Sequence, residues 1–167
     1  IQTHGITKYI KTVPGGASRQ DSAYNALAAV NYADTDILIF HDAARPFVSP
    51  ETMQDCIAAT QEHGASAAYV PVHDTIAEID NDFVTSVPAR DRMYYAQTPQ
   101  GFRFSVIKAA HERARRESLS GTDDVSLVLA AGFRVKMIDG DYSNFKITTD
   151  YDYQAACGIA ETNHSRP

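Results

Sequence analysis

The sequence has no tryptophan, only two cysteines and no apolar run that approaches the length of a membrane helix. Such a helix needs roughly 18 or more apolar residues in a row, so we expect no membrane partner. Cys56 and Cys157 are too few and too isolated for a disulfide framework or a zinc site, which favours reduced thiols in a cytoplasmic protein. Acidic residues outnumber basic ones, and the net charge of -6 argues against a nucleic-acid partner. A few local cations would have to hold any anionic small substrate.

The length and the order of the expected elements point to one α/β domain over 1–167. A chain of 167 residues with 44% hydrophobic and 22% charged residues has the composition of an ordinary globular domain. Apolar runs and helical segments alternate along the first half, which favours a mostly parallel sheet with right-handed crossovers.

Local signals place the individual elements. We expect strands over 6–12, 36–41, 65–72, 93–97 and 133–138, and a loop over 98–102 that contains Pro99 and Gly101. We expect helices that begin near Ser18, Ser49, Ser105, Thr122 and Thr149, with stops at Gly64, near Glu117 and at Gly132.

A β-hairpin arm is expected within 74–92. Two short runs, 75–79 and 83–87, face each other across the turn-forming residues 80–82. An isolated hairpin has little core of its own and is marginally stable. Packing against a second subunit would stabilise it, and packing on its own domain is equally compatible.

The end of the strand at 36–41 is the first candidate site. The strand runs into His41-Asp42-Ala43-Ala44-Arg45-Pro46, at the edge where open α/β sheets bind their ligands. Asp42 can take a metal ion or a sugar hydroxyl, and Arg45 can form a forked pair with a phosphate. The alternative is an ordinary strand exit with a surface ion pair.

Three further segments carry candidate residues, each with a structural alternative. The turn 15–22 leads from glycines into a helix start, where backbone amides face a ligand or a plain cap, and it contains Arg19 and Ser22. Thr122-Asp123-Asp124 reads as a capped helix or as a contact to a substrate hydroxyl. Lys146, on an apolar strand beside a helix start, suits a phosphoryl group or faces solvent.

Two histidines, His41 and His73, each precede an aspartate at a strand end. For both we expect an orienting hydrogen bond rather than a part in catalysis.

Six ordered motifs together resemble one family. They are Gly15-Gly16-x-x-Arg19-x-x-Ser22, His41-Asp42-Ala43-Ala44-Arg45-Pro46, Asp74-Thr75, Gln97-Thr98-Pro99-Gln100-x-Phe102, Thr122-Asp123-Asp124 and Asn144-x-Lys146-Ile147-Thr148. In order and spacing the chain is similar to the 2-C-methyl-D-erythritol 4-phosphate cytidylyltransferases of the non-mevalonate isoprenoid pathway. The resemblance implies a Rossmann-like, three-layer nucleotidyltransferase fold with a mostly parallel sheet and a projecting β-hairpin arm.

The resemblance also implies a reaction and a homodimer. A polyol phosphate attacks the α-phosphorus of CTP, pyrophosphate leaves, and Mg²⁺ or another divalent cation shares the charge. By motif matching, Gly16 and Ser22 contact the cytosine, Arg19 shapes their turn, Asp42 meets ribose, metal or polyol, and Arg45 meets the polyol phosphate. Thr98 and Thr122 bind the acceptor, Lys146 stabilises the transition state, and Thr75 and Arg90 reach from the 74–92 dimerisation arm into the partner's site.

The acceptor stays open between two relatives of this family. Ala43-Ala44 resembles the erythritol-phosphate branch, whereas 142–146 has features of the ribitol 5-phosphate branch, and the first lies where the polyol should sit. A non-catalytic dimerisation or ligand-binding module is the alternative from another class. The resemblance places the protein in the cytoplasm, or in the plastid stroma of a plant or alga.

The family's amino-terminal CTP-phosphate loop has no counterpart in this sequence, and no initiating methionine or signal-like segment is present. That loop carries an arginine and a lysine that cradle the triphosphate, so we expect the 167 residues alone to be catalytically silent.

Overall fold

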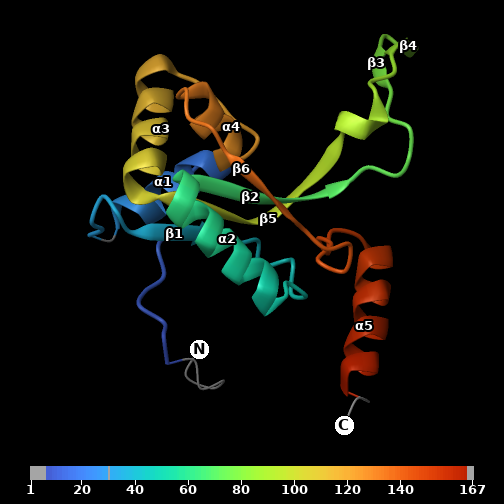
Figure 1. The fold of residues 1–167 in the computed structure, drawn as a ribbon, viewed down its shortest axis with the longest axis horizontal. Coiled ribbons are helices and arrows are strands. Elements are labelled where there is room, and N and C mark those ends of the chain that lie inside the picture. Colours follow the sequence, from blue (N-terminus) through green and yellow to red (C-terminus); the bar gives the residue numbers. More distant parts are fainter. Residues whose placement is uncertain (1–6, 30, 165–167) are drawn as a thin grey trace.

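The computed structural model describes residues 7–29 and 31–164 (Figure 1). Its elements, in chain order, are α1 (Arg19–Ala28), β1 (Ile37–Phe40), α2 (Pro50–His63), β2 (Ala65–Pro71), β3 (Glu78–Asp80), β4 (Phe83–Ser86), the 3₁₀ turn η2 (Arg90–Arg92), β5 (Tyr94–Arg103), α3 (Phe104–Glu117), α4 (Asp124–Ala130), β6 (Lys136–Asp139) and α5 (Asp150–His164). Among these residues, no helix has the length and apolar character needed to cross a lipid bilayer.

A mixed sheet of four strands in the order β1-β5-β2-β6 forms the centre of the molecule. Strand β5 runs antiparallel to β1 and to β2, and β6 runs parallel to β2. Therefore β1, β2 and β6 share one direction and only β5 opposes them. The predicted α/β class with a mostly parallel sheet is confirmed, and β5 separates the two strands that the first crossover joins.

Helices cover both faces of this sheet and make three layers. Ala67 of β2 packs with residues of α1, α3 and α4 in a core that contains Phe102 and Ile107. Its neighbour Ala68 packs with Cys56 of α2 on the opposite face. Successive side chains of a strand point to opposite faces, so β2 is buried on both sides and its residues read as a continuous small, apolar run.

Gly101 of β5 lets α2 approach the sheet closely. A Cβ at this position would lie 2.2 Å from Oγ1 of Thr60 and 2.9 Å from Sγ of Cys56. The Thr60 hydroxyl also hydrogen-bonds Oγ of Ser66 at 2.7 Å, so the contact is tight and polar. Only a residue without a side chain fits between helix and strand here.

Most local signals of helix and strand were correct. Ser18 caps α1 by accepting the Asp21 amide, Ser49 caps α2 by accepting the Thr52 amide, and Gly64 ends α2. The expected hairpin is confirmed as β3 and β4, which pair antiparallel and project from the body of the molecule (Figure 1).

The loop expected over 98–102 is wrong, because these residues lie within β5. Proline and glycine are loop signals in a sequence, and pairing with strands on both sides overrides them. The register between β2 and β5 shifts between Ala67 and Tyr69, opposite 97–99, and this irregularity accommodates Pro99 inside a central strand.

Two expected helix caps were also misplaced by one or two residues. Helix α4 is capped by Asp123 rather than Thr122, through a capping box with Ser126. Helix α3 starts before Ser105, because the amides of Phe104 and Ser105 donate to the carbonyls of Asp36 and Asp34 and need no side-chain cap.

Two expected strands differ from the structure. Residues 7–12 form no strand, and the remaining residue of that expectation, Ile6, lies outside the described residues. Lys146 lies in the connection between β6 and α5 rather than on a strand, and β6 itself begins at Lys136. Strand assignment depends on a neighbour to pair with, which local alternation does not supply.

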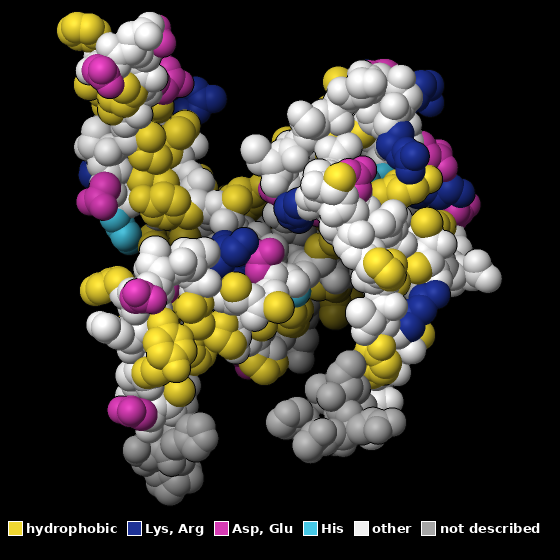
Figure 2. All heavy atoms as spheres, turned by 180° about the vertical axis from the view of Figure 1, so that it is seen from behind, with side chains coloured by type: hydrophobic (Ala, Val, Ile, Leu, Met, Phe, Trp, Pro, Cys, Tyr) yellow, Lys and Arg dark blue, Asp and Glu magenta, His cyan; other side chains and the backbone are white. Residues whose placement is uncertain are grey.

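The arm and α5 are two of the places where large apolar side chains are exposed. On the arm, Ile79, Phe83, Val84 and Val87 are 59–75% exposed, and Tyr151 of α5 is 80% exposed. Figure 2 shows hydrophobic side chains along the arm and again over α5, which extends away from the sheet (Figure 1). A contiguous exposed apolar surface of this kind marks an interaction site in soluble proteins.

Candidate functional site

A cavity of about 170 Å³ lies beyond the end of β1 and brings most of the predicted residues together. It is lined by Arg19, Asp42, Arg45, Ala96, Gln97, Thr98, Gln100, Thr122, Asp123 and Lys146. Three cations and two carboxylates therefore face one space, although they come from segments far apart in the sequence. Such convergence of charged groups at strand ends is typical of a ligand site in an α/β sheet.

Asp42 is the centre of the charge arrangement. Its Oδ2 lies 3.2 Å from Nζ of Lys146 and 3.3 Å from Nε of Arg45. Burial raises the pKa of Asp42, but the hydrogen bonds and charges of Lys146 and Arg45 together outweigh it and hold the pKa below its ordinary value. Asp42 is therefore an anion at neutral pH that neutralises two cations, and a bound phosphate can compete for both.

Arg45 is held in place by backbone carbonyls as well as by Asp42. Its Nη1 donates to the carbonyl of Asn144 at 2.8 Å, and its Nη2 donates to the carbonyl of Ala96 at 3.4 Å. The amide of Ile147 in turn donates to the carbonyl of Ala44. These bonds fasten the connection after β6 to the end of β1, which is what places Lys146 beside Asp42.

A short hydrogen-bond chain orients Thr98. Its Oγ1 accepts the Asp42 amide at 3.0 Å, so its own proton goes to Nδ1 of His41 at 2.9 Å. Nε2 of His41 then donates to the carbonyl of Arg45 at 3.0 Å. His41 makes the expected orienting hydrogen bonds, whereas the ring of His73 stacks on Tyr142 at a centroid distance of 4.8 Å.

The turn before α1 holds Gly16 and Ser22 close together. The Gly16 amide donates to Oγ of Ser22 at 2.9 Å, and that hydroxyl donates to the carbonyl of Ser18 at 2.9 Å. A Cβ on Gly16 would lie 2.3 Å from Cβ of Asp21, so this turn requires glycine. Neither residue lines the cavity, and Arg19, which follows on α1, is the residue that connects the turn to it.

The segment 122–124 combines the two interpretations of its sequence. Asp123 is the structural cap of α4 and also accepts a hydrogen bond from Nε2 of Gln100 at 3.0 Å. Thr122 lines the cavity beside it. Asp124 is fully buried, and burial raises its pKa, but the hydrogen bond from His111 and the charge of Arg19 bring the pKa below its ordinary value.

Thr75 and Arg90 lie away from this cavity, at the base of the arm. Nη1 of Arg90 donates to the carbonyl of His73 at 2.9 Å, and both predicted residues are exposed. Their expected place is the partner's site, so the structure of one chain does not test it.

The sequence assigned no role to three lining residues, Ala96, Gln97 and Gln100, and it named Asp123 only within a segment with two interpretations. Gln97 and Gln100 lie within the family motif 97–102, so that motif was the available signal for both. Gln97 exchanges hydrogen bonds with the backbone of Asp141, at 2.8 and 3.3 Å, and its Oε1 accepts from the buried Asn144. Gln97 therefore holds the wall of the cavity in place and contributes no charge to it.

In the part of the chain that the structure describes, no group of three or more His, Cys, Asp and Glu side chains is placed to hold a metal ion. Asp42 and Asp123 are the two carboxylates at the cavity. Mg²⁺ in phosphate chemistry is commonly held by one or two carboxylates together with the substrate phosphates. The donor set therefore fits an ion that arrives with a nucleotide and not a resident metal centre.

The three-layer fold and the phosphate-suited cavity define the class of nucleotidyltransferases, and solved structures similar to the chain agree. A crystal structure from Thermus thermophilus superposes with a TM-score of 0.80 at 36% identity and covers 88% of this chain and 71% of its own. One from Francisella tularensis superposes with a TM-score of 0.82 at 30% identity, covering 86% and 69%. Both are structures of 2-C-methyl-D-erythritol 4-phosphate cytidylyltransferase.

The chain belongs to the 2-C-methyl-D-erythritol 4-phosphate cytidylyltransferase family, whose profile matches residues 1–162. A curated member from Syntrophotalea carbinolica is 43% identical over 162 residues, which are 97% of this chain and 70% of that protein. A member from Bacillus cytotoxicus is 41% identical over 91% of this chain and 66% of its own length. The chain thus spans about two thirds of the length of the curated relatives it matches, and the family is one of cytidylyltransferase enzymes.

Proposed function

We propose that this site belongs to a cytidylyltransferase that transfers CMP from CTP to 2-C-methyl-D-erythritol 4-phosphate and releases pyrophosphate. The observation that carries the proposal is the convergence of Arg19, Arg45 and Lys146 on one cavity around Asp42. Three cations of this kind suit two phosphorylated substrates, and the name of the family supplies their identity.

The reaction needs positioning and charge more than it needs a reactive side chain. An oxygen of the polyol phosphate attacks the α-phosphorus of CTP, the new P–O bond forms in line, and the bond to pyrophosphate breaks. Lys146 is half-exposed and lies at the cavity, so it can donate to the phosphoryl oxygens that gain charge. Arg45, held by two carbonyls and Asp42, presents a fixed guanidinium to the polyol phosphate.

A divalent cation, Mg²⁺ in this proposal, would be held by Asp42 together with the substrate phosphates and would neutralise charge on the triphosphate. Asp42 fits this part because its pKa lies below the ordinary value, so the carboxylate is ionised over the whole neutral range.

Thr98 and Thr122 are proposed to bind the polyol hydroxyls, and Gly16 and Ser22 the cytosine. Thr98 is the better-defined of the two threonines, because His41 and the Asp42 amide fix its hydroxyl. Gly16 and Ser22 lie on the turn that precedes Arg19, which is consistent with a base bound beside the cavity.

Methylerythritol phosphate is favoured over ribitol 5-phosphate as the acceptor. Ala43 and Ala44, which resemble the erythritol-phosphate branch, lie between the two cavity residues Asp42 and Arg45. The family match supports the same choice.

A homodimer formed through the 74–92 arm is the proposed assembly. The hairpin exposes Ile79, Phe83 and Val84 by 60–75%, more than a hairpin in water can leave uncovered without cost. In such a dimer Thr75 and Arg90 would reach the partner's cavity. Two free cysteines are consistent with the proposed cytoplasmic location.

Titration calorimetry tests the proposal on this chain. We expect 2-C-methyl-D-erythritol 4-phosphate to bind more tightly than ribitol 5-phosphate, and CTP with Mg²⁺ to bind the same preparation. Lys146→Met should weaken binding of CTP with Mg²⁺ roughly tenfold or more, the effect of one lost charge-assisted hydrogen bond to its phosphoryl oxygens. Lys108→Met, which removes a lysine of α3 outside this cavity, is the matched control and should have no effect.

The same titration separates the alternatives. A non-catalytic dimerisation module would ignore CTP and both polyol phosphates, and tighter binding of ribitol 5-phosphate would change the acceptor. Pyrophosphate release is a separate measurement, because we predict that the 167 residues alone are silent. Robust turnover by this chain would contradict that prediction.

A further inference from the structure

His111 is a buried histidine that the proposed reaction does not use. It lies on α3, it is 1% exposed, and its Nε2 is 3.0 Å from Oδ1 of Asp124. Its other ring nitrogen, Nδ1, is buried with no hydrogen-bond partner among the described residues. The contact with Asp124 is therefore the ring's one hydrogen bond, and the proton belongs on Nε2 because a carboxylate only accepts.

Asp124 connects His111 to the ligand site. The carboxylate is fully buried at the start of α4, and its second oxygen, Oδ2, lies 2.7 Å from Nη2 of Arg19. Arg19 lines the cavity with Asp42 and Lys146 and is 46% exposed. One carboxylate thus connects a histidine in the core to a cation at the ligand site.

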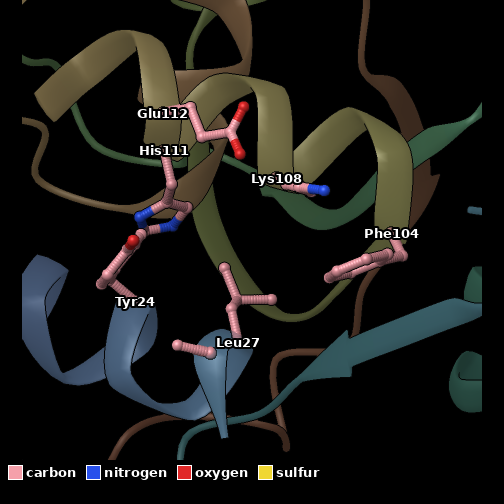
Figure 3. A pocket seen from close by; sticks show the side chains of 7 residues that line it. Tyr24, Leu27, Phe104, Lys108, His111 and Glu112 are labelled. Carbon is pink, nitrogen blue, oxygen red and sulfur yellow. The ribbon is translucent and has the colours of Figure 1, made fainter. Parts of the chain in front are cut away.

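The packing around His111 fixes its ring. The side chain points from α3 toward Tyr24 of α1, with Leu27 and Phe104 in the wall of the same small cavity (Figure 3). The ring centroids of His111 and Tyr24 are 6.2 Å apart, and the guanidinium of Arg115 lies over the Tyr24 ring, 4.1 Å from its centroid. These neighbours restrain the ring on the side of α1, so the hydrogen bond from Nε2 in turn restrains the carboxylate of Asp124.

The guanidinium of Arg19 has few other restraints. Among the described residues its side chain has a single hydrogen-bond acceptor, Asp124. A half-exposed arginine with one acceptor samples several rotamers unless that acceptor is held rigidly. Here the acceptor Asp124 is fully buried, and its other oxygen is restrained by the hydrogen bond from His111.

We propose that His111 is a positioning residue that acts through Asp124 to aim Arg19 at the nucleotide. That Arg19 faces a nucleotide rests on the proposed function, whereas the effect of His111 on the orientation of the Arg19 guanidinium does not. A residue with a merely structural role would join α3 to α4 and leave the Arg19 guanidinium as it is.

Two readouts on the full chain test this inference. One is ¹⁵N NMR of the Arg19 guanidinium, which reports rotation about its Cζ–Nη bonds, and the other is the Kd of CTP by calorimetry. His111→Leu removes the donor and keeps an apolar side chain of similar reach. His111→Gln keeps an N–H donor near the position of Nε2. The side chain of His111→Asn is too short for its N–H donor to reach Asp124. Glu112→Gln is the matched control on the same helix and cavity wall.

We expect fast rotation of the Arg19 guanidinium and a Kd for CTP roughly five- to tenfold higher in His111→Leu and His111→Asn, in the range of one ordinary hydrogen bond. His111→Gln should restore both readouts, and Glu112→Gln should match the parent chain. In an Arg19→Ala background, His111→Leu should add no further loss of CTP affinity, because the effect passes through Arg19.

Folded His111→Leu and His111→Asn variants with the parent's Arg19 rotation would overturn the inference. If His111→Leu does not fold, the comparison of the Gln and Asn variants decides it, since equal Arg19 rotation in the two contradicts the proposal. Failure of the parent chain to bind CTP and both polyol phosphates would refute the proposed function instead, and the NMR comparison would still judge the role of His111.

Discussion

Gly101→Ala is the substitution whose cost the structure defines most sharply. The new Cβ would lie 2.2 Å from Oγ1 of Thr60, 2.9 Å from Sγ of Cys56 and 3.1 Å from Cδ1 of Ile39, three contacts below normal van der Waals separation. Overpacking of a well-packed core costs about 1–3 kcal/mol. Displacing the Thr60 hydroxyl also strains its bonds to Ser66 and to the Cys56 carbonyl, both 2.7 Å, at about 1 kcal/mol each.

Alanine recovers about 0.5–1 kcal/mol over glycine within a regular element. The net expectation is a loss of about 2–4 kcal/mol in the free energy of unfolding, a large share of the roughly 5–15 kcal/mol of a typical domain. Urea unfolding followed by circular dichroism measures this loss, and the m-value should stay constant.

Two further variants make the test specific. Gly158→Ala in α5 introduces a methyl group that meets no described atom within 4 Å apart from the nearby backbone of its own helix, so it should stabilise by up to about 1 kcal/mol. Thr60→Ala removes the nearest clashing atom, so the double variant should be less destabilised than the sum of the two single changes by about 1 kcal/mol or more. A Gly101→Ala chain within about 0.5 kcal/mol of the parent, or additive single changes, would refute the reasoning.

Three further predictions follow from charge and exposure. Asp124 has a folded-state pKa below the ordinary 3.8, so its stabilisation is complete above that pH and is lost as the pH falls through the lower folded value; urea unfolding against pH should show a shallower acid slope in Asp124→Asn, and an unchanged slope would contradict the assignment. Phe83→Glu on the arm should convert the proposed dimer to a monomer in sedimentation velocity, with Leu129→Glu, an exposed residue of α4, as the control that leaves the assembly intact. Asp42→Asn frees Lys146 and Arg45 of their shared counter-ion, so inorganic phosphate should bind roughly several-fold more tightly by calorimetry, and equal affinity would count against the charge arrangement.

Local chemistry decided the elements that the sequence predicted correctly. Ser18 and Ser49 cap helices because a hydroxyl two or three residues before a helical amide is a local arrangement, and the arm forms across a turn of three residues. The 98–102 segment shows the opposite case, since only its two neighbouring strands make it part of β5.

The candidate site likewise has features that the sequence predicted and features that it could not predict. The order of motifs along the chain singled out Arg45 and Lys146 as suited to phosphate and Asp42 as suited to a metal ion or a sugar hydroxyl, and residue type with motif order was enough for that. Nothing local predicts that Lys146 lies 3.2 Å from Asp42, because the connection after β6 is held there by bonds to Arg45 and Ala44.

The sequence alone determined the class of the fold, the family and the residues that can carry phosphate chemistry, since these depend on periodicity, on caps and on residue types in a fixed order. Only the tertiary structure decided which of those residues share a cavity and that β5 runs antiparallel to its neighbours. It also decided that Asp124 connects His111 to Arg19. The physical reason is range: capping and alternation act within a few residues, whereas the sheet pairs positions up to 70 residues apart. The Arg19–Asp124 ion pair and the hydrogen bond from Arg45 to the Asn144 carbonyl join positions 105 and 99 residues apart.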